Sequence, residues 1–247
     1  MTKKRYPYLD LLKDKKYFNR VELHEAMNLV KGSEIKEAAF KARRQRLLVN
    51  GKIMRVGRNA YKVLEDDLRQ YTPTYSSLAE EISIIVDYSF PNADYRIEEL
   101  KQLNEFVPQP YPKNIIFLAI QEEMAPFIFG LCRKYYPGRV FLNPNLKTFK
   151  AIDQEEVIVI RKIVTETPRG IEKKWYSRME VLLVDLVANP IWFHYVDPRE
   201  IKHIYEAAFD TYIIDESTMF RYAKRRGVYN KIKEFIDDYT DIELNVK

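Results

Sequence analysis

The chain has 247 residues, of which 46% are hydrophobic, and its net charge is +5. This length exceeds that of an average single domain, and this much apolar sequence can bury a sizeable core. No run of 18 or more apolar residues occurs, and the N-terminus lacks the apolar stretch and cleavage site of a signal peptide. We therefore expect a cytoplasmic protein with no contact to a membrane. The single cysteine, Cys132, excludes an internal disulfide, and its apolar neighbours predict a buried thiol.

The positive charge is concentrated in the first third of the chain. Residues 1–74 hold 18 Lys or Arg against 9 Asp or Glu, a net charge of +9, whereas the rest holds 23 against 27, a net charge of −4. Such a division predicts that the N-terminal part meets a polyanion and that the remainder has another role.

A polar segment at residues 64–74 marks the predicted domain boundary. It contains Pro73 and interrupts the periodicity on both sides. We expect two domains, one at residues 1–68 and one at residues 72–247.

The first domain has the element order of a winged helix-turn-helix. The expected elements are a short helix near residues 8–12, a helix at 20–29 capped by Asn19, a helix from a Ser33 cap to Val49, and strands at 53–56 and 60–63. Gly51 stands where a left-handed helix terminator belongs. Gly57, Arg58 and Asn59 suit positive φ and a hairpin between the strands.

The second domain mixes both kinds of element. Strands are expected at 114–120, 139–142 and 157–164, and helices at 77–87, 121–136, 176–187, 198–209, 217–226 and 229–239. The predicted fold class is α/β, α+β overall, with a helical C-terminal layer. The strand order is not predictable from this pattern.

Basic residues crowd the third helix and the hairpin, as in proteins whose helix enters the major groove. The predicted DNA-binding residues are Lys36, Lys41, Arg43, Arg44, Gln45, Arg55, Arg58 and Asn59. The alternative is a solvated basic helix in a winged helix that contacts proteins.

The apolar spacing assigns the two faces of the third helix. Phe40 and Leu47 are expected to face inward together with Ile35, Ala39 and Ala42, although Leu48 then falls on the outward face. Lys41, Arg44 and Gln45 become the candidates for base contacts, and Arg55 and Arg58 for backbone contacts.

A second basic cluster, residues 221–226, precedes Gly227. The predicted contact residues in it are Arg221, Lys224, Arg225 and Arg226. Cations in the last helical turn complement the helix dipole by about 0.3–1 kcal/mol each, which is an alternative reason for their presence.

The sequence offers little for catalysis, and we expect neither an enzyme nor a bound metal or cofactor. His24, His194 and His203 lack metal-ligand spacing, and phosphate-binding and nucleophile motifs are missing. The pair Gly32-Ser33 resembles the opening of a nucleotidyltransferase site, but no Asp-x-Asp pair follows, so a helix cap is favoured.

One pair of carboxylates, Glu180 and Asp185, lies on an apolar helix. Five residues apart, they point in different directions around it, and no strand carrying Glu-x-Lys accompanies them. A capping or partner-contact role is therefore favoured over a nuclease site.

Several segments resemble AbiEi-type antitoxins of type IV toxin–antitoxin systems. They are the hairpin run at residues 51–61, Leu103-Asn104-Glu105-Phe106 with Gln109-Pro110, the helix at residues 179–186, and the basic run at residues 221–226. In that helix Val181 stands where the family has lysine, whereas Glu180 and Asp185 match. No single motif is specific, but their order and the domain sizes agree with the family.

The resemblance implies an antitoxin that represses its own promoter by binding double-stranded DNA through the N-terminal domain. It also implies that the C-terminal domain counteracts a nucleotidyltransferase-like toxin, with or without a stable complex. Two other interpretations stay open: a ligand-sensing winged-helix transcriptional regulator, and a nuclease.

Overall fold

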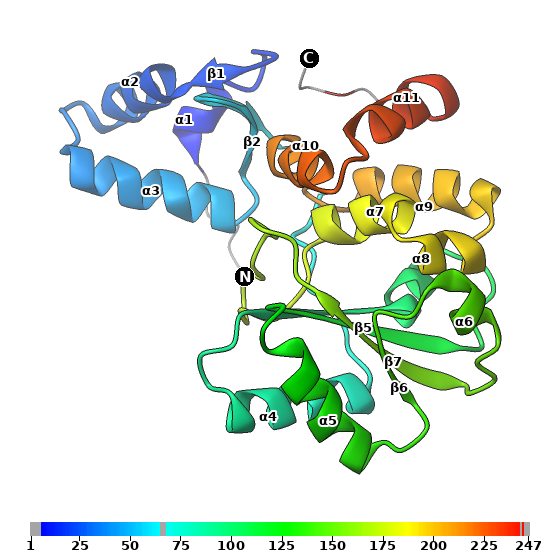
Figure 1. Ribbon diagram of the computed structural model, residues 1–247. Helices are drawn as coiled ribbons and strands as arrows, with labels where there is room; N and C mark the ends of the chain where they lie inside the picture. The colour runs from blue at the N-terminus through cyan, green and yellow to red at the C-terminus, as the bar shows by residue number, and fades with distance from the viewer. Residues whose placement is uncertain (1–5, 65–67, 243, 245–247) are drawn as a thin grey trace. The chain divides into compact units, whose positions relative to one another are not determined.

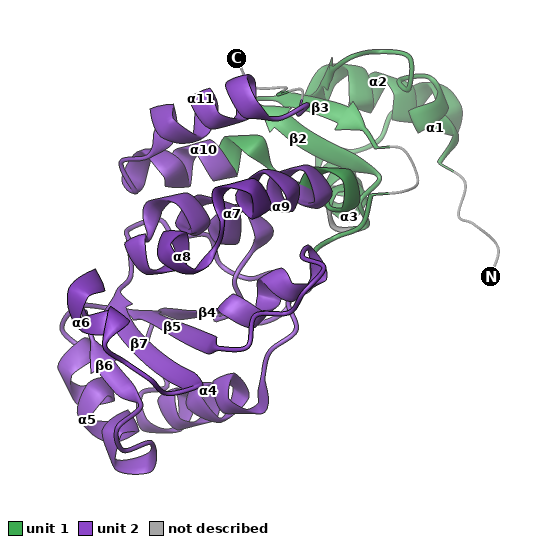
Figure 2. Cartoon of the chain, turned by 90° about the vertical axis from the view of Figure 1, so that its right-hand side faces the viewer, with its two compact units in different colours: residues 1–71, 209–218, 243–247 green, residues 72–208, 219–242 purple. Residues whose placement is uncertain are grey.

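The computed structural model describes residues 6–64, 68–242 and 244. The chain divides into two compact units (Figure 2). Of the described residues, unit 1 holds those of 6–71 and 209–218 together with 244, and unit 2 holds 72–208 and 219–242. Segment 209–218, which the sequence assigned to the second domain, thus belongs to unit 1. Residues 1–5, used in the signal-peptide argument, and 65–67 of the predicted linker lie outside the described residues.

Unit 1 combines helices with a small antiparallel sheet. Its elements are α1 (Pro7–Asp10), β1 (Phe18–Asn19), α2 (Arg20–Lys31), α3 (Glu37–Val49), β2 (Ile53–Gly57) and β3 (Ala60–Val63). The strand order is β1-β3-β2, and β3 pairs antiparallel with both neighbours. Strand β1 was not predicted, because two residues carry no periodicity.

The ends of α2 follow the local chemistry of the sequence. The Asn19 side chain accepts hydrogen bonds from the amides of Val21 and Glu22, and the Glu22 carboxylate accepts one from the Asn19 amide. Gly32 ends the helix with φ of +72°. The predicted Asn19 cap is confirmed, whereas the predicted Ser33 cap is wrong. Helix α3 begins at Glu37, and Lys36 occupies its N-cap position without a side-chain bond.

The core of unit 1 lies between the helices and the sheet. Phe40 and Leu47 of α3 are fully buried there, against α2 and the ring of Tyr61. Phe18 stacks on Tyr61 with ring centroids 5.9 Å apart. Each such side chain stabilises the fold by roughly 1.5–3 kcal/mol.

Segment 209–218 completes a second, smaller cluster in unit 1. Ile213 packs there with Met54, Val56 and Leu64. Gly51 permits this approach: its φ is +58°, and a Cβ on it would lie 2.4 Å from Ile213 Cδ1. A fragment that ends at residue 68 would therefore expose part of the hairpin's apolar face.

Unit 2 is built on a mixed four-stranded sheet with order β4-β5-β7-β6. Its strands are β4 (Tyr95–Glu99), β5 (Asn114–Ile120), β6 (Val140–Leu142) and β7 (Glu156–Lys162). Strand β7 is parallel to β5 and β6, and β4 runs antiparallel to β5 at the edge.

Helices cover both faces of this sheet (Figure 1). One face packs on α4 (Ser77–Ser89) and α5 (Ala125–Tyr135), where Cys132 is buried and burial raises the pKa of its thiol to about 11. The other face meets α7 (Met179–Ala188) and α8 (Pro190–Tyr195), with Phe117 and Trp192 ring centroids 5.4 Å apart. Because both faces are covered, β5 and most of β7 are buried throughout.

The remaining helices lie between β6 and β7 or follow α8 in the chain. They are α6 (Leu146–Lys150), α9 (Pro198–Thr211), α10 (Glu216–Arg225) and α11 (Tyr229–Tyr239), and a 3-10 turn spans Leu100–Glu105. The expected mixed α/β class with a helical C-terminal segment is thus confirmed. Within the described residues, no helix has the length and apolar character needed to cross a bilayer.

Candidate functional site

The outward face of α3 carries small and polar side chains. At 100° per residue, Ala38, Ala42 and Gln45 lie opposite the buried Phe40 and Leu47, and all three are exposed. Lys41 flanks this stripe and is also exposed. The prediction that Ala39 and Ala42 face inward is wrong: between Ile35, which precedes the helix, and Leu47, only Phe40 is fully buried.

Arg44 does not point outward as expected. Its guanidinium carbon lies 6.0 Å from the ring centroids of both Phe40 and Tyr61, and its Nε atom is buried without a hydrogen-bond partner. The aromatic rings between α3 and β3 hold the side chain by cation–π contact, which favours arginine at such positions. Arg44 thus joins the helix to the sheet instead of extending from the outward face.

The hairpin presents its own polar tip. Arg55, Arg58 and Asn59 are exposed, and Asn59 adopts the left-handed conformation with φ of +59°. The Asn59 side-chain oxygen accepts a hydrogen bond of 3.2 Å from the amide of Arg20, which fixes the tip to the start of α2. Arg55 donates from Nε to the Gly57 carbonyl at 3.1 Å. The predicted hairpin is confirmed, and its tip is anchored.

The connection between α2 and α3 is held by three polar side chains. Asn28 accepts from the Ile35 amide and His24 Nε2 donates to the Ile35 carbonyl, both at 2.8 Å. Lys31 Nζ donates to the Glu34 carbonyl at 3.3 Å. His24, considered as a metal ligand in the sequence, is thus used to fix the orientation of α3.

The exposed cations of α3 and the hairpin outnumber their acidic neighbours. We call the following set the basic face: Lys36, Lys41, Arg43, Gln45, Arg46, Arg55, Arg58 and Asn59. Glu37 pairs with Arg20 and with Lys41, the latter at 3.8 Å. Six cations of this face are therefore opposed by few carboxylates, an arrangement suited to a polyanion.

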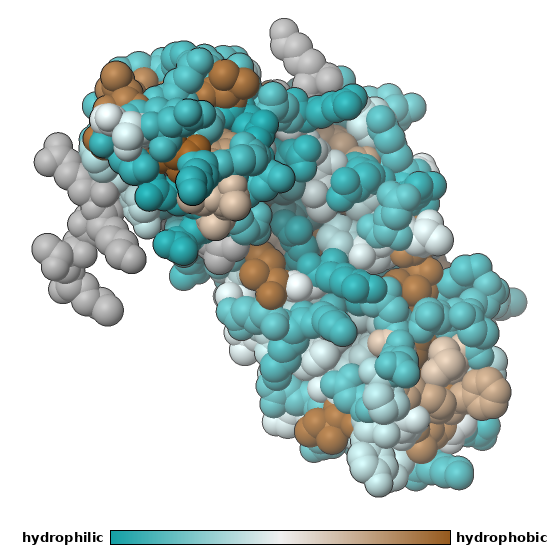
Figure 3. Space-filling model, turned by 90° about the vertical axis from the view of Figure 1, so that its left-hand side faces the viewer, coloured by the Kyte–Doolittle hydropathy of each residue, from teal (hydrophilic) through white to brown (hydrophobic). Residues whose placement is uncertain are grey.

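The space-filling view in Figure 3 gives the character of one side of the molecule. Its surface is mostly hydrophilic (teal), and apolar side chains (brown and tan) occur in several patches, of which the broadest lies at the lower right of the view.

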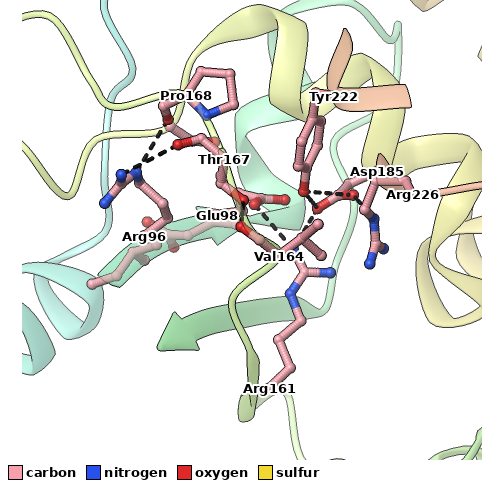
Figure 4. Close-up of polar contacts among 12 residues, drawn as sticks. Arg96, Glu98, Arg161, Val164, Thr167, Pro168, Asp185, Tyr222 and Arg226 are labelled. Atoms are coloured by element: carbon pink, nitrogen blue, oxygen red, sulfur yellow. Dashed lines mark hydrogen bonds and ion pairs between the residues drawn. The ribbon is translucent and has the colours of Figure 1, made fainter. Parts of the chain in front are cut away.

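A cluster of buried charges occupies unit 2 around Asp185 (Figure 4). Arg161 Nη2 lies 2.5 Å from Asp185 Oδ2, and Arg226 Nε lies 2.7 Å from Oδ1. The Tyr222 hydroxyl donates to the same carboxylate at 3.2 Å. Burial alone would raise the pKa of Asp185, but the two guanidinium groups hold it below its ordinary value.

Glu98 on β4 shares Arg161 with Asp185. Arg161 Nη2 lies 3.0 Å from Glu98 Oε1, while Glu98 Oε2 is buried without a hydrogen-bond partner. Burial raises the pKa of Glu98 to about 8; the charge of Arg161 opposes the rise, and that of Asp185 adds to it. The pKa of Glu98 is thus shifted in the direction opposite to that of Asp185, although both carboxylates contact Arg161. The sequence did not single out Glu98 or Arg161.

The other predicted contact residues of unit 2 divide by exposure. Glu180 is buried and held by Arg178 at 3.0 Å. Arg221, Lys224 and Arg225 are exposed, and Arg225 pairs with Glu166. Glu180 and Asp185 thus face inward, so they support arginines and cannot themselves form the surface that a partner touches. Whether the exposed residues bind a partner stays a prediction.

The described residues contain no group of three His, Cys, Asp or Glu side chains that could hold a metal ion.

Comparison with known proteins places the chain in a family. The sequence profile of a family of unknown function, DUF6577, matches residues 39–242. The chain belongs to the DUF6577 family. The match begins in α3 and includes the hairpin and all of unit 2. A search of curated proteins found no match.

Proposed function

We propose that unit 1 is a winged helix-turn-helix that binds double-stranded DNA, with α3 as its recognition helix and the β2-β3 hairpin as its wing. The observation that carries the proposal is the basic face: a helix whose outward stripe is small and polar, followed by an anchored hairpin with a cationic tip. A helix with this surface fits the major groove, roughly 12 Å wide, while a hairpin tip contacts phosphates or the minor groove.

The exposed side chains fall into those suited to base contacts and those suited to contacts with the DNA backbone. Gln45 reads bases, because its amide can bond to adenine N6 and N7, and the Ala38 and Ala42 methyl groups permit close approach to the groove floor. Lys36, Lys41, Arg43, Arg55, Arg58 and Asn59 contact the backbone and set the orientation. Arg44 acts indirectly, by fixing α3 on the sheet.

The experiment is a fluorescence-anisotropy titration of the full chain with the duplex upstream of its own reading frame and with an unrelated duplex. Q45A should reduce discrimination between them by about 1–3 kcal/mol, the size of one base contact. R58A should weaken both duplexes alike. K134A on α5 is the control, because it removes an exposed cation of unit 2. Absence of wild-type binding at low salt would contradict the proposal.

We further propose that the chain is the antitoxin of a type IV toxin–antitoxin pair and represses its own promoter. The support is the resemblance to AbiEi-type antitoxins. Two of the segments of this chain that carry the resemblance form α7 and the end of α10 in unit 2. The exposed side chains of α10 (Arg221, Lys224 and Arg225) are the surface through which unit 2 counteracts a nucleotidyltransferase-like toxin, and the buried Asp185 holds Tyr222 and Arg226 beneath it.

A neighbouring gene for a nucleotidyltransferase would favour that role, and co-expression of its product with this chain tests it. K224A/R225A should lose rescue of growth while keeping promoter binding. R46A/R58A should lose promoter binding while keeping rescue, and it removes the same number of charges. If the variants swapped these effects, the assignment of antitoxicity to unit 2 would be wrong. Metal-dependent cleavage of DNA by the purified chain would favour the nuclease interpretation.

A further inference from the structure

Unit 2 contains a cleft that DNA binding by unit 1 does not use. Its volume is about 520 Å³, within the usual range for small-molecule sites. Its walls come from the end of α4, from residues 91–95 and from the segment after β7. The charged side chains around it are Asp87, Asp94, Arg169, Lys173 and Lys174.

The cations stand on a loop, residues 167–177, that is fastened at both ends to β4. At one end the buried Arg96 donates to the carbonyls of Pro168 at 3.1 Å and Thr167 at 3.4 Å (Figure 4). At the other end the Ile97 amide donates to the Trp175 carbonyl at 3.1 Å, and the Ser177 amide donates to the Tyr75 hydroxyl at 2.8 Å.

The tip of this loop is tightly folded. Gly170 has no room for a side chain, because a Cβ there would lie 2.3 Å from the Lys173 carbonyl oxygen. Lys173 Nζ lies 5.4 Å and 5.3 Å from the ring centroids of Trp175 and Tyr176. The only acid of the tip, Glu172, accepts a hydrogen bond from Thr72 at 3.3 Å and does not line the cleft. The Lys173 ammonium is therefore held in place, which lowers the entropy lost when a ligand binds.

The carboxylates of the cleft already have partners. Asp94 pairs with Arg96 at 3.0 Å and with Arg169 at 3.5 Å, and Asp87 accepts from the Tyr95 hydroxyl at 2.8 Å. In the described part of the chain, no carboxylate pairs with Lys173 or Lys174. The side chains that line the cleft carry three positive charges against two negative ones, so a net charge of +1 remains in a partly enclosed space.

We propose that this cleft binds the phosphate group of a small phosphate monoester. Lys173, Lys174 and the outer edge of Arg169 supply donors for its oxygens, as charge-assisted hydrogen bonds. The rings of Tyr95 and Trp175 are buried, at 4% and 5% exposure, so they form a floor and offer no face for a base to stack on. Recognition therefore centres on the phosphate, and the organic part extends toward the open side.

Isothermal titration of the full chain with AMP, adenosine and inorganic phosphate tests the proposal. AMP should bind, adenosine should not, and inorganic phosphate should compete with AMP. K173A/K174A should weaken AMP binding by about tenfold or more, because both unpaired cations are removed. R133A/K134A is the matched control, since it removes two adjacent exposed cations from α5, and it should leave the affinity within about twofold.

A second variant tests the role of the loop. G170A keeps every charge but forces the tip apart, so it should weaken AMP binding while the circular dichroism spectrum stays that of the wild type. The proposal is overturned if AMP shows no binding at about 1 mM, if adenosine binds as well as AMP, or if both double variants weaken AMP equally. None of these outcomes depends on whether unit 1 binds DNA.

Discussion

Arginines serve opposite purposes in the two units of this chain. On the basic face of unit 1, Arg46 and Arg58 are exposed and no carboxylate of the described residues pairs with them. Around Asp185 in unit 2, Arg161 and Arg226 are largely buried and share carboxylates at 2.5–3.0 Å. Exposed cations contribute little to folding and are free for a polyanion, whereas buried ones are committed to the fold. Whether an arginine is buried and paired with a carboxylate, more than how many arginines a unit has, thus distinguishes arginines that support the fold from those that can bind a ligand.

The largest effect should come from Asp185. D185N leaves Arg161 and Arg226 without their charged partner inside unit 2, so it should lower the free energy of unfolding by about 3–5 kcal/mol. E37Q removes a carboxylate that pairs with exposed cations and should cost about 1 kcal/mol or less. Urea unfolding followed by circular dichroism measures both. Equal losses would contradict the distinction between the two units.

The pH dependence of stability should follow Glu98. Its pKa is raised from 4.5 to about 8 in the folded chain, so the folded state binds the proton more tightly. Stability should therefore be highest near pH 5 and fall toward pH 8, by at most about 1.4 kcal/mol per pH unit. Asp185, whose pKa is lowered, acts only at more acidic pH.

E98Q is the matched variant for this prediction, since its amide keeps the shape of the protonated carboxyl. The fall in stability between pH 5 and pH 8 should be smaller in E98Q than in the wild type. A wild-type stability that rises over this interval would show that Glu98 is ionised inside the cluster.

Replacing Arg44 should have an effect on stability between that of replacing Asp185 and that of replacing an exposed arginine. R44A loses the contacts with Phe40 and Tyr61 and should destabilise unit 1 by about 1 kcal/mol. R46A, two residues away and exposed, should change stability by less than about 0.5 kcal/mol. Chemical denaturation compares them. If R46A were the more destabilising, the placement of Arg44 against the rings would be wrong.

The smallest effect on stability should be that of Arg58 at the hairpin tip. R58A removes an exposed side chain and should leave the midpoint of thermal unfolding within about 2 °C of the wild type. Its DNA affinity should fall nonetheless, because the tip loses a phosphate contact. A large drop in thermal stability would mean that Arg58 supports the hairpin.

Local signals predicted much of the fold. The strand at Asn114–Ile120 and the helix at Tyr229–Tyr239 have the bounds that the sequence indicated, because apolar runs and helical periodicity are properties of the segment itself. Strand β4 was missed, since Arg96, Glu98 and Glu99 make its sequence look exposed although all three are buried. Their burial depends on partners far along the chain.

The candidate site shows the same limit. The hairpin and the basic residues could be predicted from the sequence. The inward orientation of the Arg44 side chain could not, because it depends on Tyr61, which comes from another element. Asp185 attracted notice as a charge on an apolar helix. Its partners Arg161 and Arg226 lie 24 and 41 residues away, and no local pattern links them.

The central claim, that the basic face of unit 1 binds a polyanion, is tested most directly by the salt dependence of promoter binding. If about four to six phosphates are neutralised, a plot of log affinity against log salt should have a slope near −4 to −5 for the wild type. For R58A the slope should be shallower by about 1. A slope near zero, or no binding at low salt, would contradict the account.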